Sequence, residues 1–397
     1  MIIMHIDVNN AFLSWTAIDL LNKGFKEDIR NICAVIGGDE SLRHGIVLAK
    51  STPCKKLGIK TAMTLKDAKR ICPSLKVFPP NYKLYSKMSN KLFELLSKYT
   101  NDIEVASIDE CYLDYTPVLK LYGNEIEFAK KIQKEIYDTL GFTVNVGIAN
   151  NKLCAKMASD FSKPNKIHTL YNFEIKDKMF PLDIIELFGV GKQTANKLID
   201  LNIKTIGDLA NSDVYYLSKY FKNQARVLID MANGIDDSKV ISETTSPKGI
   251  SHEITLVKDI SEIELLFPYL MELSEKVALR LRKEKKYTNT VCVIIKDNYF
   301  KRKTHQRKLK NATNITLEIY NVAKEILKEM EISNVRLIGI RLDNLVTNKD
   351  YQTSLFESVE VRDNDEKFDS VIDSLKDKYG ETIITKASLK GVNNIRK

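Results

Sequence analysis

Three acidic residues stand in otherwise apolar segments, where a carboxylate is costly unless it is paired, protonated or bound to a metal. Asp7 ends the run IIMHID, and Asp109 and Glu110 lie within ASIDECYLD (106–114). As part of a strand, ASIDECYLD would direct Asp109 and Glu110 to opposite faces, because side chains alternate. Carboxylate oxygens are ligands that Mg²⁺ prefers, so the three acids predict a two-metal site for phosphoryl transfer. The alternative is that they are surface charges or members of salt bridges.

Basic residues that suit a triphosphate lie in two other segments. They are Lys152, Lys156 and Lys163 in GIANNKLCAKMASDFSKPNKI (147–167), and Lys55 and Lys56 in AKSTPCKKLGIK (49–60). Beside a metal site these lysines would meet phosphate as point charges, although each alone is more often a solvated side chain. They therefore predict the nucleotide side of the same site.

A glycine turn predicts a contact with DNA phosphate. Gly189 and Gly191 in LFGVGKQTANKL form a tight turn, and a helix then begins near Lys192. Backbone N–H groups at such a helix start suit an anion. The alternative is an ordinary corner between two helices.

The positive charge of the chain is concentrated in one segment. The 397 residues carry a net charge of +9, whereas 276–310 alone holds thirteen Lys and Arg against Glu284 and Asp297. A stretch of this kind is typical of binding to a phosphate backbone, with a solvated helix face as the alternative. A strand pattern, TVCVIIKDNYF, interrupts the charges, so we expect a basic sheet that binds DNA. Its candidate contacts are Lys296, Lys301, Arg302, Lys303 and Arg307.

Length and composition bound the class of protein. A chain of 397 residues with 44% hydrophobic residues predicts about two to four ordinary domains. It has no run of about 18 apolar residues and no basic leader, so we expect neither a membrane span nor a signal peptide. The six cysteines are scattered without a zinc-ligand spacing, which favours a reducing, cytoplasmic setting.

Hydrophobic periodicity divides the chain into blocks. Residues 1–170 alternate strand-like runs (2–8, 45–51, 103–113 and 143–150) with helical ones such as 125–140. Residues 171–236 are expected to be helical, and 237–249 have the composition of a linker. Residues 250–346 show two strand-like runs (290–297 and 335–345) and two amphipathic helices (264–284 and 317–330). The tail, 347–397, is mostly polar, with an amphipathic docking helix expected at 368–380 through Phe368, Val371, Ile372 and Leu375.

Four of these motifs together resemble those of the Y-family translesion DNA polymerases. Asp7 followed by Phe12, ASIDECYLD, GIANNKLCAKMASDFSKPNK and LFGVGKQTANKL occur in the order of that family. The resemblance covers residues 1–346 and leans, within the bacterial DinB/UmuC branch, towards the UmuC-like side. It implies an α+β multidomain right hand: palm and fingers at 1–170 (fingers about 20–78), a helical thumb with a helix-hairpin-helix at 171–236, and a little-finger domain at 250–346 after the linker.

The resemblance also assigns the site. It implies Asp7, Asp109 and Glu110 as catalytic metal ligands, with the Val8 carbonyl as a fourth, for two Mg²⁺ ions or Mn²⁺. Phe12 matches the residue whose ring excludes a ribose hydroxyl, and its alternative is a core Phe.

The expected triphosphate contacts are Asn10, Thr52, Lys55 and Lys163. Two of them depart from the DinB pattern, since Thr52 and Lys55 stand where that branch has Tyr and Arg. Asn9 and Asn10 likewise replace an acid and an aromatic residue.

The expected function is low-fidelity addition of dNTPs to a primer 3′-OH across damaged template. Gln352, Leu355 and Phe356 in YQTSLFESVEV resemble a sliding-clamp peptide, so the expected partners are primer-template DNA, dNTPs and a bacterial clamp, with the polymerase a monomer. One rival is an accessory protein that binds DNA without catalysis. Another is a cyclase, because GGDE (37–40) is similar to the diguanylate cyclase signature. Ser41 follows GGDE where that signature has an aromatic residue, so a hairpin turn is preferred.

Overall fold

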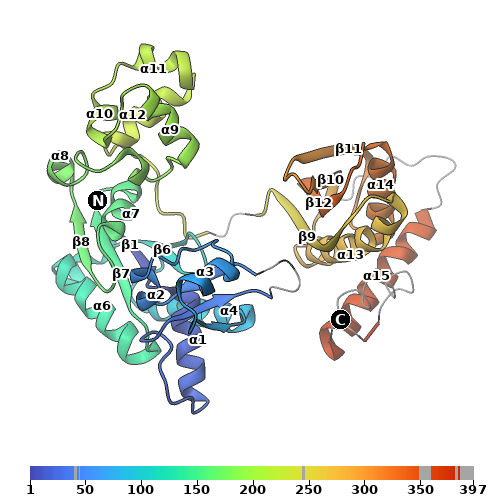
Figure 1. Cartoon of the computed structure of the whole chain (residues 1–397), viewed down its shortest axis with the longest axis horizontal. Coiled ribbons are helices and arrows are strands. Elements are labelled where there is room, and N and C mark those ends of the chain that lie inside the picture. Colours follow the sequence, from blue (N-terminus) through green and yellow to red (C-terminus); the bar gives the residue numbers. More distant parts are fainter. Residues whose placement is uncertain (40–42, 44, 244–245, 348–358, 381–382, 385–397) are drawn as a thin grey trace. The chain divides into compact units, whose positions relative to one another are not determined.

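The computed structural model describes the chain except residues 40–42, 44, 244–245, 348–358, 381–382 and 385–397 (Figure 1). The chain forms two compact units, one of residues 1–38 and 46–244 and the other of residues 39–45 and 245–397. Within the described ranges, no helix is both long and apolar enough to cross a membrane.

A five-stranded sheet forms the centre of the first unit. Its order is β5 (Ile103–Val105), β6 (Glu110–Asp114), β1 (Ile3–Val8), β7 (Val144–Ala149) and β8 (Ile167–Leu170). All neighbouring pairs are antiparallel except β7 and β8. The central strand β1 places Asp7 opposite Glu110 on one side and Asn145 on the other.

Different helices pack on the two faces of this sheet. Met4, Ile6 and Val8 enter one hydrophobic core, which also contains residues of α1 (Ala11–Asn22), α4 (Tyr82–Leu96) and α6 (Glu125–Leu140). Strand alternation sends His5 and Asp7 to the opposite face, where α7 (Lys152–Asp160) packs.

Gly147 allows α7 to approach the sheet closely. A Cβ at this position would lie 2.0 Å from the Ala155 carbonyl oxygen and 2.5 Å from the Ser159 nitrogen. The backbone of α7 therefore rests directly on β7, and this contact fixes the height of the lysines of α7 above the sheet.

The expected strand over 103–113 is corrected by the structure to two strands and a turn. The Ala106 and Ser107 N–H groups both donate to the Glu110 carbonyl oxygen, at 3.1 Å. The Ser107 hydroxyl also bonds the Asp109 carboxylate (2.7 Å), a local bond of the kind that competes with a strand ladder. Asp109 consequently lies in the turn before β6, so alternation does not separate it from Glu110.

A small three-stranded sheet follows α1. Its order is β3 (Val47–Lys50), β2 (Ala34–Gly37) and β4 (Lys76–Phe78), with the helices α2 (Thr52–Lys56) and α3 (Leu65–Ile71). It has its own core around Val35, Val47 and Leu65. Strands β2 and β3 are antiparallel, as expected for a hairpin at GGDE, although Glu40 lies outside the described residues.

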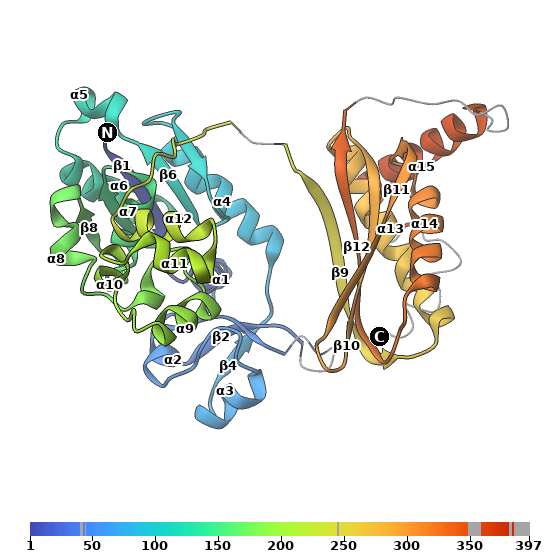
Figure 2. The same cartoon turned by 90° about the horizontal axis from the view of Figure 1, so that it is seen from above.

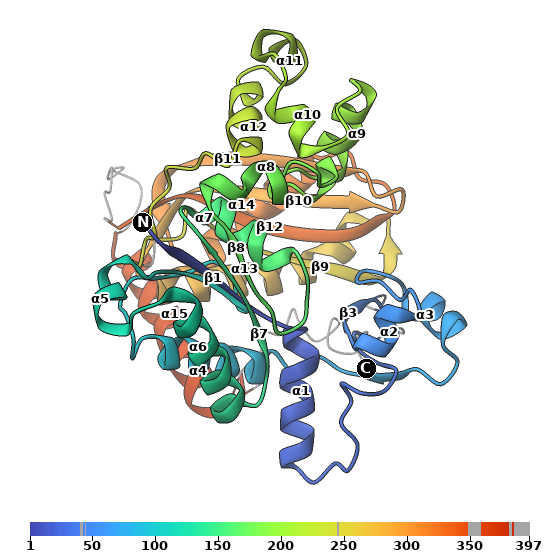
Figure 3. The same cartoon turned by 90° about the vertical axis from the view of Figure 1, so that its left-hand side faces the viewer.

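The segment after β8 is helical, as its sequence predicts. It contains α8 (Ile175–Lys178), α9 (Lys192–Asp200), α10 (Ile206–Ala210), α11 (Val214–Phe221) and α12 (Gln224–Ala232), with two short 3₁₀ turns at Asn172–Glu174 and Ile184–Glu186. Figure 3 shows α9 to α12 as one group. Their core includes Leu198, Leu209 and Leu228 and is continuous with residues of α7.

The second unit is a four-stranded antiparallel sheet with helices on one face (Figure 2). The order is β11 (Arg302–Thr313), β10 (Tyr287–Asp297), β12 (Val335–Val346) and β9 (Gly249–Ile260), and α13 (Phe267–Lys283) and α14 (Thr316–Glu329) pack on it. The expected count of two strands is wrong, because both edge strands were missed. Strand β11 carries polar residues on both faces, so it lacks the alternation that identifies a half-buried strand.

The tail helix α15 (Val359–Tyr379) docks on this second unit through charge. Arg282 of α13 holds Asp373 through two bonds (2.6 and 3.0 Å) and Asp369 at 3.1 Å. Asp369 also accepts the Thr316 N–H (2.8 Å), which caps α14, whose own N-cap residue Ile315 offers no side-chain bond. The expected apolar docking face is corrected, because Phe368 and Val371 are 61% and 57% exposed.

Replacing Arg282 should release α15. Arg282→Met leaves two nearly buried carboxylates without their cation, so the local opening free energy of α15 should fall by about 3 kcal/mol. Hydrogen–deuterium exchange over 359–379 measures this change. The control is Lys283→Met, which removes an exposed pair with Asp377 and should cost less than about 1 kcal/mol. Equal exchange in both variants would contradict the assignment.

Candidate active site

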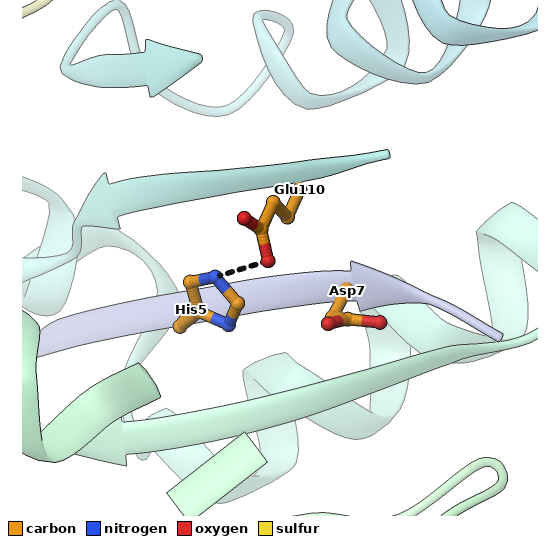
Figure 4. A group of neighbouring side chains, drawn as sticks. All are labelled: His5, Asp7 and Glu110. Atoms are coloured by element: carbon orange, nitrogen blue, oxygen red, sulfur yellow. Dashed lines mark ion pairs between the residues drawn. The ribbon is translucent and has the colours of Figure 1, made fainter. Parts of the chain in front are cut away.

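The structure brings the three predicted carboxylates together where β1 ends. Asp7 and Glu110 are paired in register, and the Val8 N–H donates to the Asp109 carbonyl oxygen (3.0 Å), which ties the turn to β1. Asp7 and Asp109 line a cavity, whereas Glu110 lies beside His5 (Figure 4).

Two lysines of the segment 152–163 lie against these carboxylates. The Lys156 Nζ is 2.7 Å from the Glu110 Oε2 and 3.3 Å from the Asp7 Oδ2. The Lys163 Nζ is 3.0 Å from the same Asp7 oxygen, and both lysines also reach Asp160. The sequence predicts a phosphate contact for Lys156 but gives no sign of its pairing with Asp7 and Glu110.

Lys152 is not part of this group. Its ammonium donates to both carboxylate oxygens of Glu104, at 2.7 and 2.8 Å. The expectation that it faces a triphosphate is therefore corrected to a salt bridge within the first unit.

The charges of the site alter its acid–base behaviour. The Lys156 ammonium, 2.7 Å from the Glu110 Oε2, lowers the pKa of that carboxyl. Burial raises the pKa of Asp109, and the negative charges of Asp7 and Glu110 raise it further. Burial alone would lower the pKa of Lys156, but its bond to Glu110 and the charge of Asp7 outweigh it and raise that pKa. At neutral pH the Glu110 carboxylate and the Lys156 ammonium are therefore both charged, and they lie in direct contact.

His5 is a site residue that the sequence analysis missed. It is fully buried, and its Nδ1 lies 2.8 Å from the Ser159 hydroxyl. One ligand atom each from His5, Asp7 and Glu110 lie within 4.8 Å of one another (Figure 4). The signal was present in the run HID, because residues two apart on a strand share a face.

The cavity beside Asp7 and Asp109 has a volume of about 680 Å³. It contains all four residues expected to bind the triphosphate, Asn10, Thr52, Lys55 and Lys163. Lys50 and Lys56 also line it, and the sequence analysis had not singled out Lys50. The cavity therefore joins the end of β1 to the small sheet through a lining rich in cations.

Phe12 lines the cavity, and aromatic residues of α4 pack against its ring. Its ring stacks on Tyr85 with centroids 4.4 Å apart and an angle of 7°, and it meets the edge of Tyr82 at 6.3 Å. The same ring packs against two of the hydrophobic cores. The gate and core interpretations are therefore compatible, because the core fixes a ring that faces the cavity.

Asn9 positions the loop that carries Lys163. Its Oδ1 accepts the Asn165 N–H (2.8 Å) and the Thr143 hydroxyl (2.9 Å), and its Nδ2 donates to Asn145 (3.1 Å). An acid at this position could accept these bonds but could not donate to Asn145. The amide thus explains how this departure from the family pattern is accommodated.

The predicted glycine turn precedes a helix, as expected. Gly189 has φ of +86°, which favours glycine, and Gly191 is the N-cap of α9 without a side-chain bond. A Cβ at Gly191 would meet no atom within 4 Å, and Lys192 is exposed. The backbone at this helix start is open to an anion.

The basic residues of the second sheet divide between its two faces. Lys296 and Arg302 lie on the face away from α13 and α14, together with Lys308 and Lys310, which the sequence analysis had not chosen. Arg307 instead pairs with Glu325 and Glu329 of α14, and Lys303 bonds the Glu331 carbonyl. Lys303 and Arg307 therefore do not belong to the basic face that the sequence predicts. Lys301 precedes β11 and is exposed.

The predicted clamp residues Gln352, Leu355 and Phe356 lie outside the residues that the structure describes.

Known proteins share this architecture. The impB/mucB/samB family matches residues 6–160, and the impB/mucB/samB family C-terminal domain matches residues 247–355. The DNA polymerase IV of Clostridium acetobutylicum is 46% identical over 391 residues, 98% of each chain, and that of Clostridium kluyveri is 39% identical over 367 residues, 90% of this chain and 91% of the relative. The solved Y-family DNA polymerase chimera Dbh-Dpo4(243-245)-Dbh has a TM-score of 0.76 at 30% identity, covering 88% of this chain and all of that one.

The chain therefore belongs to the Y-family DNA polymerases, on their DinB-like side. It is a DNA-directed DNA polymerase with the α+β palm, fingers, thumb and little finger that the sequence predicted. The expected lean towards the UmuC-like side is corrected by these relatives. The non-catalytic accessory protein and the cyclase are set aside.

Removing the Asp109 charge should stabilise the metal-free chain. Because the pKa of Asp109 is raised in the folded state, its ionised form is disfavoured there, so Asp109→Asn should raise the thermal midpoint at pH 7 by about 1–2 °C. The wild-type chain regains stability as the pH falls through the folded pKa of Asp109, so the difference should shrink towards pH 4. Thermal unfolding in EDTA measures it.

The control is Asp102→Asn, which alters an exposed aspartate of the same segment and should leave the thermal midpoint at pH 7 nearly unchanged. An Asp109→Asn variant less stable than wild type at pH 7 would contradict the claim that burial and the two acidic neighbours disfavour an ionised Asp109.

Proposed function

We propose that this polymerase adds dNTPs to a primer 3′-OH by two-metal nucleotidyl transfer, across damaged as well as intact template and with low fidelity. The observation that carries the proposal is the pairing of Asp7 with Glu110 across two strands, with Asp109 beside them at the cavity. Asp7 and Asp109 therefore face the cavity where a substrate would bind, and Glu110 lies next to Asp7 behind them.

The donor set fits divalent ions such as Mg²⁺. Asp7, Asp109 and Glu110, with the Val8 carbonyl, offer hard oxygen ligands, which Mg²⁺ and Mn²⁺ accept. Lys156 and Lys163 contact Asp7, Glu110 and Asp160, and Asp109 adds a fourth carboxylate, so the acids outnumber the lysines and the group carries excess negative charge. Bound ions would supply a lowered pKa for the attacking hydroxyl and charge neutralisation for the leaving pyrophosphate.

The residues of the cavity would orient the nucleotide. Lys55 and Lys163 place positive charge on two sides of the cavity, and Thr52 adds a hydroxyl. Asn10, in a left-handed conformation (φ 50°) before α1, is exposed and lines the same cavity. The Phe12 ring, backed by Tyr85, would exclude a 2′-hydroxyl by steric contact.

The remaining parts of the chain would bind DNA and tether the polymerase to a sliding clamp. We assign the palm and fingers to 1–170, the thumb to 171–236, the linker to 237–249 and the little finger to 250–346. The Gly189–Gly191 turn and the face bearing Lys296 and Arg302 would contact phosphates without reading sequence. The segment 352–356 would dock on a sliding clamp.

Primer extension tests this proposal. Wild type should extend a primer on intact and abasic templates with Mg²⁺, and Asp109→Ala should lower extension by roughly 10³-fold or more. Asp114→Ala is the matched control, because Asp114 is an acid at the far end of the same strand, β6, and should retain extension. Retained extension in Asp109→Ala would contradict the assigned site, and arrest of wild type at the abasic position would contradict bypass.

Phe12→Ala should relax selection against ribonucleotides. Removal of the ring opens the wall where a 2′-hydroxyl would clash, so the ratio of ribonucleotide to deoxynucleotide incorporation should rise by roughly 10-fold or more. Single-nucleotide insertion kinetics measure the ratio. Phe25→Ala removes a ring that packs on Phe78 instead and should leave the ratio unchanged. An unchanged ratio in Phe12→Ala would restrict Phe12 to the core.

Deletion of residues 352–356 should abolish stimulation by the clamp and spare basal extension. The apolar pair Leu355 and Phe356 would supply the anchors, and Gln352 would fix the register. Extension with and without the loaded bacterial clamp measures the effect. Ser358→Ala, just beyond the peptide, serves as the control, and clamp stimulation that survives the deletion would rule the peptide out.

A further inference from the structure

The second ring nitrogen of His5 is buried without a hydrogen-bond partner. Among the residues that the structure describes, the Nε2 of His5 is one of three buried polar side-chain atoms in this state. The ring has no solvent exposure, and Tyr112 packs against it with centroids 4.8 Å apart. Leaving a polar atom buried and unpaired costs free energy, so the position calls for an explanation.

The hydrogen bonds around Ser159 decide which nitrogen carries the proton. The Ser159 hydroxyl has one proton and donates it to the Lys156 carbonyl oxygen (2.8 Å), which can only accept. The same hydroxyl must therefore accept from the His5 Nδ1, which lies 2.8 Å away. The neutral ring thus carries its proton on Nδ1, and Nε2 presents a lone pair.

That lone pair points at the catalytic carboxylates. The His5 Nε2 is 3.4 Å from the Glu110 Oε2, and Asp7 follows His5 on the same face of β1 (Figure 4). Two acceptors in contact repel unless a cation lies between them. Two ligand atoms on one tetrahedral ion, with bonds of about 2.1 Å, lie about 3.4 Å apart.

We propose that the His5 Nε2, Asp7 and Glu110 form a cation site that selects ions accepting imidazole nitrogen, such as Mn²⁺, Co²⁺ or Zn²⁺, over Mg²⁺. Imidazole suits these ions, whereas Mg²⁺ takes oxygen ligands. The site shares two ligands with the catalytic centre of the proposed function, on which its significance rests. An ion bound with His5 would draw Asp7 and Glu110 away from the oxygen-only arrangement.

Lys156 competes for this site. Its ammonium lies 2.7 Å from the same Glu110 oxygen, so an ion can bind His5 and Glu110 only when the ammonium moves away. Asp160, one turn further along α7 and already 3.5 Å from the ammonium, offers the alternative partner. Removing the Lys156 charge should therefore tighten binding of the ion.

Spin-echo spectroscopy of Mn²⁺ on the full chain, with ¹⁵N-labelled histidine, tests the site directly. The wild-type protein should show the ¹⁵N coupling of a coordinated imidazole, and His5→Phe, which keeps a ring against Tyr112, should lose it. The control is His168→Phe, because His168 also bonds a serine hydroxyl (Ser162, 2.8 Å) near an aromatic ring but lies on β8, two strands away from β1. That variant should keep the coupling.

Optical titration with Co²⁺ supplies a second readout. The dissociation constant for Co²⁺ should rise roughly 10-fold or more in His5→Phe, while that for Mg²⁺, from calorimetry, should be unchanged. The dissociation constant for Co²⁺ should fall in Lys156→Met, because the competing ammonium is removed. Absence of coupling in wild type overturns the proposal whatever the variants do, as does coupling that persists in His5→Phe or a Co²⁺ affinity unchanged in Lys156→Met.

Failure of this inference is distinguishable from failure of the proposed function. Primer extension by wild type in Mg²⁺ without other divalent ions depends on the oxygen ligands alone. Extension without imidazole coupling rejects only the His5 site, whereas coupling without extension rejects only the proposed reaction.

Discussion

The mutual repulsion of three carboxylates at one end of β1 is the constraint on which the site depends. Asp7, Asp109 and Glu110 are brought together by a strand register and a turn, and burial, with the charges of the two neighbouring acids, raises the pKa of Asp109. The chain offsets this cost with Lys156 and Lys163, both from the segment on and after α7. The lysines stabilise the metal-free fold, and their charges also suit the triphosphate of an incoming nucleotide.

Close packing is what delivers those lysines. Because Gly147 has no Cβ, α7 rests on β7, and Lys156 and Ser159 descend to the level of Glu110 and His5. The amides of Asn9 and Asn145 then hold the loop after α7, which brings Lys163 to Asp7. The close approach of α7 to the sheet and the buried amides therefore place the Lys156 and Lys163 ammoniums beside the carboxylates.

The sequence predicts which acids gather at the end of β1, because a carboxylate in an apolar segment needs a partner, and the relatives confirm the family. Periodicity also identified the central strands and α6. It failed at Asp109, where Ser107 replaces the strand ladder by a local turn, and at β11, whose edge position removes the apolar alternation. It also missed how α15 docks, since Arg282 and Asp369 meet across 87 residues and no local pattern marks that pair.

Anomalous diffraction from crystals with primer-template DNA, a non-hydrolysable dNTP and Mn²⁺ would test the central claim most directly. The account predicts Mn²⁺ peaks within bonding distance of Asp7, Asp109 and Glu110, whether or not the His5 Nε2 also binds one of them. Lys156 should then have left Glu110. Nucleotide bound in the cavity with no Mn²⁺ within bonding distance of Asp109 and Glu110 would contradict it.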